Sequence, residues 1–223
     1  MAASEPHYER AEHPVSIPVG EVTVEGNLVL PDRIDGLVLF AHGSGSSRHS
    51  PRNRYVAQVL QEGGMGTLLM DLLTREEEQE DMFTAHLRFD IELLAGRLIA
   101  ATDWLATRDD TRDLRLGYFG ASTGAAAALY AAAARPERVA AIVSRGGRPD
   151  MAAPVLSKVK APTLLIVGGK DYPVISMNQE ALEGLDAEKE LRIVEGATHL
   201  FEEPGTLEQV SRLATDWFLT YLS

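Results

Sequence analysis

The sequence of 223 residues contains no cysteine. Disulfide bonds, a thiolate nucleophile and cysteine metal sites are therefore excluded. Basic residues are also few relative to acidic ones, since 21 Lys and Arg stand against 33 Asp and Glu, for a net charge of −12. Nucleic acids and anionic membrane surfaces favour clusters of Lys and Arg, so we expect neither as a partner.

Long hydrophobic runs are missing as well. The longest, residues 125–134, is mostly alanine and is well short of the roughly 20 residues that span a bilayer. Residues 1–14 carry charges and prolines where a secretory signal needs an apolar core of about 7–15 residues. We therefore expect a cytoplasmic protein with a loose arm at 1–14 and a single domain over 15–223.

The hydrophobic pattern changes once along the chain. Residues 15–30 alternate between apolar and polar and are broken by Gly20 and Gly26, which predicts an antiparallel hairpin. After it come short, continuously apolar runs typical of strands buried on both faces, at 37–41, 67–73, 114–119, 139–143, 163–167 and 191–194. Helical patterns lie among them, at 53–62, 87–106, 123–134, 176–185 and 207–222. This alternation predicts a three-layer α/β/α sandwich with a mostly parallel sheet, which binds ligands at the carboxyl ends of its strands.

The candidate nucleophile is Ser122, at the centre of the G-x-S-x-G pattern formed with Gly120 and Gly124. The pattern lies between a predicted strand and an Ala-rich helix, where a tight turn can point one hydroxyl out of the sheet. Small residues at 120 and 124 allow the strand and helix to approach closely. The alternative is a structural serine that caps the helix.

A serine hydroxyl needs a base, and His199 is the best placed of the six histidines. It follows the last predicted strand, whereas His42 at a strand end is expected to be structural. The remaining histidines fall in the arm, at a helix start or in a polar loop, at positions 7, 13, 86 and 49.

The imidazole in turn needs a carboxylate, and Asp171 follows the strand predicted at 163–167. Its competitors are Asp150, which lies beyond the loop after the strand at 139–143, and Asp186, which sits in a turn.

An oxyanion requires preorganised N–H donors, and the segment His42-Gly-Ser-Gly-Ser-Ser follows the strand at 37–41. The backbone N–H groups of Ser44 and Thr123 are the predicted pair. The alternative is a phosphate nest, but the segment lacks the third glycine of a dinucleotide fingerprint, and the glycines at 168–169 do not fit a phosphate loop.

The order Ser122, Asp171, His199 resembles that of the α/β-hydrolase superfamily, and the segment beginning at Phe40 looks like its oxyanion loop. Small size and the lack of a lid are most similar to the dienelactone hydrolase-like group, because only residues 144–161 separate two strands where lidded relatives insert a cap domain. The resemblance implies an open site and a serine triad. Dienelactone hydrolases proper use a cysteine nucleophile, which this chain lacks. The loops at 43–54 and 144–150 resemble uncharacterised bacterial members, some similar to domains fused to phosphoribosyltransferases.

Those two loops hold His49 and five arginines, at positions 48, 52, 54, 145 and 148. His49, Arg52, Arg145 and Arg148 are candidates for binding an anionic substrate. The alternative is that the arginines pair with the acidic run at 76–81, which is expected to be a solvated loop or flap. Asp71, at a strand end, is expected to brace the oxyanion loop.

These features predict a serine hydrolase acting on small carboxylic esters, thioesters or lactones through an acyl-enzyme on Ser122. No histidine–carboxylate spacing resembles a metal site, so no metal or cofactor is expected. The alternative is a module that binds a ligand or partner on the same scaffold without turnover, and a peptidase is a lesser variant of the first hypothesis. The oligomeric state is not predicted.

Overall fold

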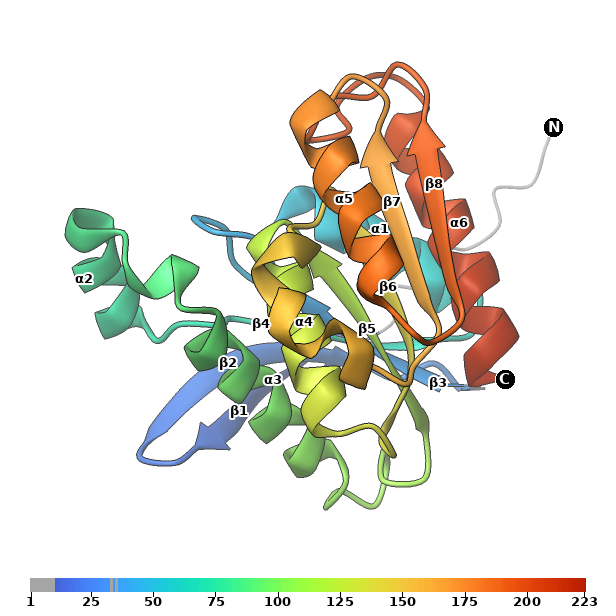
Figure 1. The fold of residues 1–223 in the computed structure, drawn as a ribbon. Coiled ribbons are helices and arrows are strands. Elements are labelled where there is room, and N and C mark those ends of the chain that lie inside the picture. The colour runs from blue at the N-terminus through green and yellow to red at the C-terminus, as the bar shows by residue number, and fades with distance from the viewer. Residues whose placement is uncertain (1–10, 33, 35) are drawn as a thin grey trace, which may run out of the picture.

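A computed structural model describes residues 11–32, 34 and 36–223, and within them eight strands form one mixed sheet (Figure 1). Their order across the sheet is β1-β2-β4-β3-β5-β6-β7-β8. The β1–β2 and β2–β4 pairs are antiparallel, and all other neighbours are parallel. The mostly parallel sheet with an N-terminal antiparallel hairpin is thus confirmed. The strands are β1 (His13–Val19), β2 (Val22–Val29), β3 (Gly36–Ala41), β4 (Gly66–Met70), β5 (Arg115–Ala121), β6 (Val139–Arg145), β7 (Thr163–Gly168) and β8 (Lys189–Val194).

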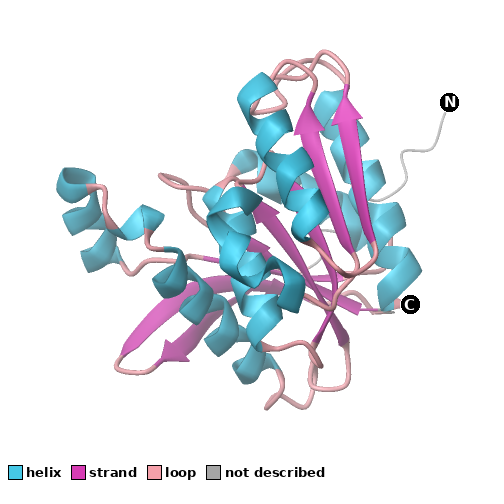
Figure 2. Ribbon diagram, in the orientation of Figure 1, coloured by secondary structure: helices cyan, strands magenta, loops and turns pink. Residues whose placement is uncertain are grey.

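Helices cover both faces of this sheet (Figure 2). One face packs against α1 (Pro51–Glu62) and α6 (Thr206–Leu222), and the other against α3 (Ile91–Leu105), α4 (Thr123–Ala134), the 3₁₀ segment η2 (Pro149–Lys158) and α5 (Tyr172–Gly184). Successive residues of β5 explain why its sequence is continuously apolar. Tyr118 is buried in the core under α3 and α4, while Phe119 is buried in the core under α1 and α6. The three predicted layers are confirmed.

The acidic run predicted as a solvated loop lies instead in a helix, α2 (Arg75–Thr84), which stands apart from the helices on the sheet (Figure 1). A capping box begins it: Thr74 Oγ1 accepts the Glu77 N–H at 3.2 Å, and the Glu77 carboxylate accepts the Thr74 N–H at 2.7 Å. The prediction was wrong because the charge run was interpreted without this cap.

Other element boundaries differ by a few residues. β4 ends at Met70 rather than at residue 73, although the Asp71 N–H still donates to the Glu25 carbonyl beside β2 at 2.9 Å. The helix predicted over 87–106 begins only at Ile91, after Asp90 caps it and after the 3₁₀ turn η1 (Leu87–Phe89). β1 begins at His13, inside the predicted arm, and residues 1–10, including His7, lie outside the described part of the chain.

The carboxyl ends of β3 and β5–β8 lie along one edge of the sheet, where the chain enters the loops that hold the predicted site residues (Figure 1). Only η2 occupies the connection from β6 to β7, so the described residues form no cap domain at this point, as predicted. In the part of the chain that the structure describes, no helix is both long and apolar enough to cross a membrane.

Candidate active site

Ser122 occupies a strained turn between β5 and α4. Its φ of 51° and ψ of −122° lie in a region that few residues other than glycine adopt. The glycines on either side permit this turn. A Cβ at Gly120 would lie 2.5 Å from Ala125 Cα, and one at Gly124 would lie 2.3 Å from the Ala41 carbonyl oxygen. The close approach of strand and helix that the sequence predicted is therefore present.

The turn is also held by its own backbone. The Ser122 N–H donates to the Arg145 carbonyl at 3.3 Å, and the Ser122 carbonyl accepts N–H groups from Ala125 and Arg148, both at 3.1 Å. These bonds tie the nucleophile position to the end of β6 as well as to α4. The serine does not cap the helix through its side chain, as the structural alternative required.

His199 and Asp171 form a direct pair at the ends of β8 and β7. The His199 Nδ1 to Asp171 Oδ2 distance is 2.6 Å, and the side chains are 39% and 12% exposed, respectively. Because Nδ1 donates to the carboxylate, Nε2 is left as the acceptor. The competing acids lie elsewhere: Asp150 binds the Arg148 guanidinium at 2.7 and 2.8 Å, and Asp186 lies between α5 and β8.

Two glycines bring this pair toward the serine turn. A Cβ at Gly168 would lie 2.6 Å from the Ala197 and Thr198 carbonyl oxygens, so the loops after β7 and β8 touch there. Gly146, with a φ of 51°, leaves room for the His199 ring. A Cβ added at position 146 would lie 3.5 Å from His199 Nδ1. Gly146 directly follows Arg145, the residue whose carbonyl binds Ser122. The three side chains predicted to form the triad are therefore brought to one end of the sheet.

The loop after β3 is anchored by two side chains. His42 donates from Nδ1 to the Gly43 carbonyl at 2.9 Å and accepts the Leu72 N–H on Nε2 at 3.0 Å. Burial lowers the pKa of His42, which favours the neutral ring that this pattern requires. Asp71 accepts the Arg48 N–H at 2.8 Å and pairs with the Arg48 guanidinium. The structural roles predicted for His42 and Asp71 are thus confirmed.

The same loop lies against the start of α4. The Thr123 hydroxyl donates to Ser44 Oγ at 3.5 Å, and a Cβ at Gly43 would lie 3.1 Å from Ser122 Cβ. The two residues predicted to supply oxyanion donors are therefore neighbours, and both lie beside the serine.

A cavity of about 480 Å³ opens between this loop and α2. Ser44 and Thr123 are among its lining residues, and Leu72, Leu73, Leu94 and Met82 supply most of its apolar wall. Glu78 also faces it, and partial burial, followed by the nearby charge of Asp71, raises the pKa of its carboxyl. The helical structure of the α2 residues was missed in the sequence, although the Thr74–Glu77 capping box was a visible signal.

Four of the five loop arginines pair with carboxylates outside the acidic run and the fifth pairs with none, so that alternative is wrong for the residues described. Arg48 pairs with Asp71, Arg52 with Glu202 at 3.2 Å, Arg54 with Glu12 at 3.8 Å and Arg148 with Asp150. The acidic run itself binds Arg97 through Glu77 and Arg88 through Asp81, each at 2.5 Å.

Arg145 differs from the other four because it pairs with no carboxylate of the described chain. Its side chain is buried, and its Nη2 lies 3.5 Å from Asn53 Oδ1. Its guanidinium carbon sits 5.9 Å from the centre of the Phe201 ring. Neither Asn53 nor Phe201 was singled out in the sequence, where nothing indicates their proximity to Arg145.

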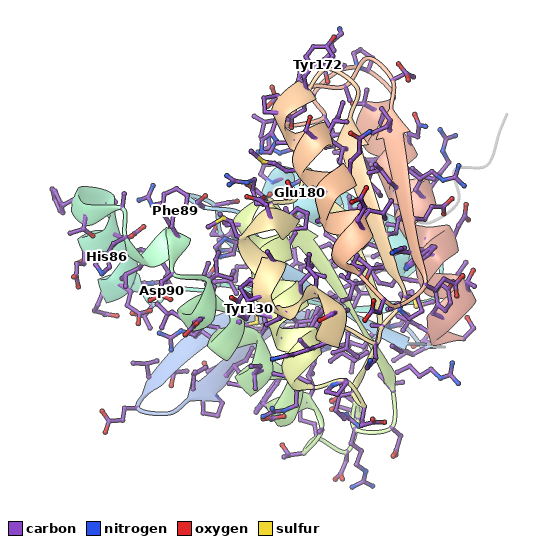
Figure 3. The ribbon with its side chains drawn as sticks, in the orientation of Figure 1. His86, Phe89, Asp90, Tyr130, Tyr172 and Glu180 are labelled. Carbon is purple, nitrogen blue, oxygen red and sulfur yellow. The ribbon has the colours of Figure 1, made fainter. Side chains whose placement is uncertain are left out.

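Two further histidines lie in other surroundings than the His199–Asp171 pair. His49 lines the cavity, whereas His86 bonds Thr84 beyond the end of α2 (Figure 3). Tyr172, next to Asp171, is exposed at the edge where β7 and β8 end. Over residues 11–32, 34 and 36–223, no cluster of three His, Asp or Glu side chains could hold a metal ion.

Comparison with known proteins identifies a family. Residues 25–220 match the model of the Dienelactone hydrolase family. The chain is 64% identical to a dienelactone hydrolase from Anabaena variabilis ATCC 29413, whose crystal structure superposes with a TM-score of 0.94 and a coverage of 96% of this chain and 99% of that one.

More distant structures share the fold. Est1E from Butyrivibrio proteoclasticus is 15% identical, with a TM-score of 0.78 and coverages of 93% and 98%. A Pyrococcus furiosus esterase is 17% identical, with a TM-score of 0.77 and coverages of 96% and 92%.

The chain is also 58% identical over 221 residues to a Mycobacterium tuberculosis protein whose name suggests a phosphoribosyl transferase. The match covers 99% of this chain and 48% of that protein. The chain thus spans about half the length of the curated relatives it matches.

Proposed function

Since the chain belongs to the dienelactone hydrolase family, we propose that it is a serine hydrolase that cleaves small carboxylic esters, thioesters or lactones. One observation carries this proposal: a serine in a strained strand-to-helix turn shares one sheet edge with a histidine that is bound, at 2.6 Å, to a largely buried carboxylate.

The mechanism follows from the roles of these three groups. His199 Nε2 accepts the Ser122 Oγ proton as Oγ attacks the substrate carbonyl, and the resulting imidazolium gives this proton to the departing alcohol or thiol. The acyl group is then bonded to Ser122 Oγ. His199 next takes a proton from water as the water oxygen attacks the acyl carbon, and returns it to Oγ when the acid leaves. Asp171 holds the ring and stabilises its charged form in both halves.

The carbonyl oxygen becomes negative in both attacks and needs N–H donors. The Ser44 and Thr123 N–H groups suit this role because Ser44 lies beside Thr123 at the serine turn. Neither N–H has a hydrogen-bond partner among the described residues, so both are available to an oxyanion. The anchoring of this loop by His42 and Asp71 supports the role, because donors that are already in place need not reorganise during the reaction.

The cavity between the loop and α2 supports a small-molecule substrate. Its volume of about 480 Å³ lies in the range of small-ligand pockets, and the two predicted donor residues, Ser44 and Thr123, belong to its lining. Between β6 and β7 the described chain holds only η2, which leaves room beside this edge for a longer substrate.

The phosphoribosyl transferase name belongs to proteins about twice as long as this chain. We assign the hydrolase reaction to the half that this chain represents, because the family match extends over residues 25–220. A binding module without turnover is the alternative to be tested.

The decisive experiment is intact-mass analysis after exposure to a fluorophosphonate, which labels activated serines. The wild type is expected to gain one adduct that Ser122→Ala abolishes, and Ser176→Ala, which changes an α5 serine, is the matched control. Folded wild-type protein that gains no adduct would contradict the proposal and favour the binding module. An adduct on both the wild type and Ser122→Ala would contradict the choice of nucleophile.

A further inference from the structure

Arg145 carries a positive charge that the described chain does not neutralise. No Asp or Glu among residues 11–32, 34 and 36–223 lies within ion-pair distance of it, and its Nε and Nη1 atoms have no hydrogen-bond partner. Only 8% of the residue is exposed to solvent. Arg97 provides the contrast, because it is also buried but pairs with Glu77.

The surroundings of Arg145 are themselves electropositive. Arg52 lies close enough for its charge to act on Arg145, and its own Nε is also buried without a partner. Glu202, which binds Arg52 at 3.2 Å, has a side chain that is 65% exposed. Burial, with a smaller contribution from Arg52, lowers the pKa of Arg145 to about 10, so the guanidinium stays charged at neutral pH.

The first turn of α1 adds a third source of positive potential. Arg52 and Asn53 belong to this turn, and Asn53 Oδ1 lies 3.5 Å from Arg145 Nη2. The dipole of the helix favours an anion near this end. Pro51 has no N–H and the Asn53 N–H already binds Ser50 Oγ, which leaves the Arg52 N–H available in this turn. The cavity beside Ser44 reaches Ser50 and Pro51, the two residues before Arg52.

A buried charge without a counterion is unfavourable, and a second charge of the same sign beside it adds to the penalty. An anion bound between the two guanidinium groups would remove both penalties. We propose that Arg145 and Arg52, with the first turn of α1, form a subsite that receives a carboxylate or phosphate group of the substrate. This assignment rests on the proposed function for the substrate, although anion binding itself can be measured without any hydrolysis.

The subsite lies within reach of the proposed chemistry. The Arg145 carbonyl binds the Ser122 N–H, and Phe201, which packs against the guanidinium, lies two residues after His199. Arg148 is not part of the subsite, because its Nε and Nη2 already bind the two carboxylate oxygens of Asp150. Of the three arginines predicted to bind an anion, the proposal therefore keeps Arg145 and Arg52.

The first test measures thermal unfolding with inorganic phosphate at constant ionic strength. At about ten times its Kd, phosphate should raise the wild-type Tm by roughly 3–6 °C. Arg145→Met should abolish this shift and, without phosphate, should unfold at or above the wild-type Tm, because it removes an unpaired buried charge. Arg97→Met is the matched control: it should lower the Tm by leaving Glu77 unpaired, yet keep the phosphate shift.

A wild-type phosphate shift that persists in Arg145→Met would overturn the subsite, and so would the absence of a shift in the wild type. Arg52→Gln provides a second variant in case Arg145→Met does not fold. The Arg52 side chain is 30% exposed, so the substitution does not open the core. It should reduce the phosphate shift by at least half, and an unchanged shift would again overturn the proposal.

The second test asks whether the anion belongs to the substrate. The ratio of kcat/KM for 4-nitrophenyl hemisuccinate to that for 4-nitrophenyl butyrate should fall about tenfold in Arg145→Met, since these acyl groups differ by one carboxylate. One outcome is that Arg145→Met loses the phosphate-induced Tm shift but keeps the wild-type ratio of kcat/KM values. That result would overturn the assignment to the substrate and leave a site for a free anion. If neither ester is cleaved but the shift depends on Arg145, the proposed function fails while the anion site stands.

Discussion

His42 links the end of β3 to the segment after β4, and its replacement offers a quantitative test of how the loop is held. His42→Leu removes the acceptor of the Leu72 N–H and the donor to the Gly43 carbonyl. Leu72 is only 1% exposed, so its N–H is left without a partner, which costs about 1–3 kcal/mol. The Gly43 carbonyl belongs to a partly exposed residue and can bind water instead. The free energy of unfolding at pH 7.5 should therefore fall by about 1–3 kcal/mol.

The pH dependence gives this prediction a second signature. Burial lowers the pKa of His42 in the folded state, so below the ordinary pKa of 6.5 the unfolded chain binds a proton that the folded chain resists. The contribution of the neutral His42 ring to the free energy of unfolding is thus fully present above pH 6.5. It is lost as the pH falls below 6.5. One group can remove at most about 1.4 kcal/mol per pH unit.

Urea unfolding at pH 7.5 and pH 5.5 measures both effects. The wild type should lose more stability between these pH values than His42→Leu, by up to about 1.4 kcal/mol. His86→Gln, which changes an exposed histidine, should lose as much as the wild type. Equal losses in the wild type and His42→Leu would refute the assignment of a neutral, buried ring.

Two further substitutions test the site from other directions. Asp171→Asn keeps the shape of the acid but cannot stabilise the His199 imidazolium, so kcat on a 4-nitrophenyl ester should fall by roughly 10³–10⁴-fold; a fall of less than tenfold would contradict the role of Asp171. Gly124→Ala places a Cβ 2.3 Å from a backbone carbonyl of β3 and should lower the Tm sharply. Gly96→Ala is the comparison, because a Cβ at this position of α3 meets no atom within 4 Å. It should raise the free energy of unfolding by about 0.5–1 kcal/mol. Calorimetry compares the two glycine variants, and similar Tm values would show that the α4 turn tolerates a side chain.

The register of the sheet explains why the sequence alone is enough to outline the site. Ala41 pairs with Gly120, and Ala121 pairs with Arg145, so the loops after β3, β5 and β6 must emerge side by side. Parallel strands buried on both faces are visible as continuous apolar runs, and each run ends where a loop begins. Candidate residues chosen because they follow such runs, as Ser122 and Asp171 do, therefore share one edge of the sheet.

Local sequence was less informative where side-chain partners come from distant segments. The acidic run was misinterpreted because charge alone does not distinguish a loop from a capped helix, although the Thr74–Glu77 cap is itself local. The arginine pairs could not be deduced at all. Arg52 binds Glu202, which lies 150 residues away, and only the folded chain determines which carboxylates reach which guanidinium groups.

The sequence by itself determined the layered architecture, the strained serine turn and the place of Asp171 and His199 after their strands, because periodicity and small residues act through neighbours along the chain. Only the tertiary structure decided that α2 closes one side of a cavity and that Arg145 is buried without a counterion among the residues described. Both depend on distances between segments that are far apart in the sequence. The energy of a charge depends strongly on its burial, which is set by those distances and not by the neighbouring residues along the chain.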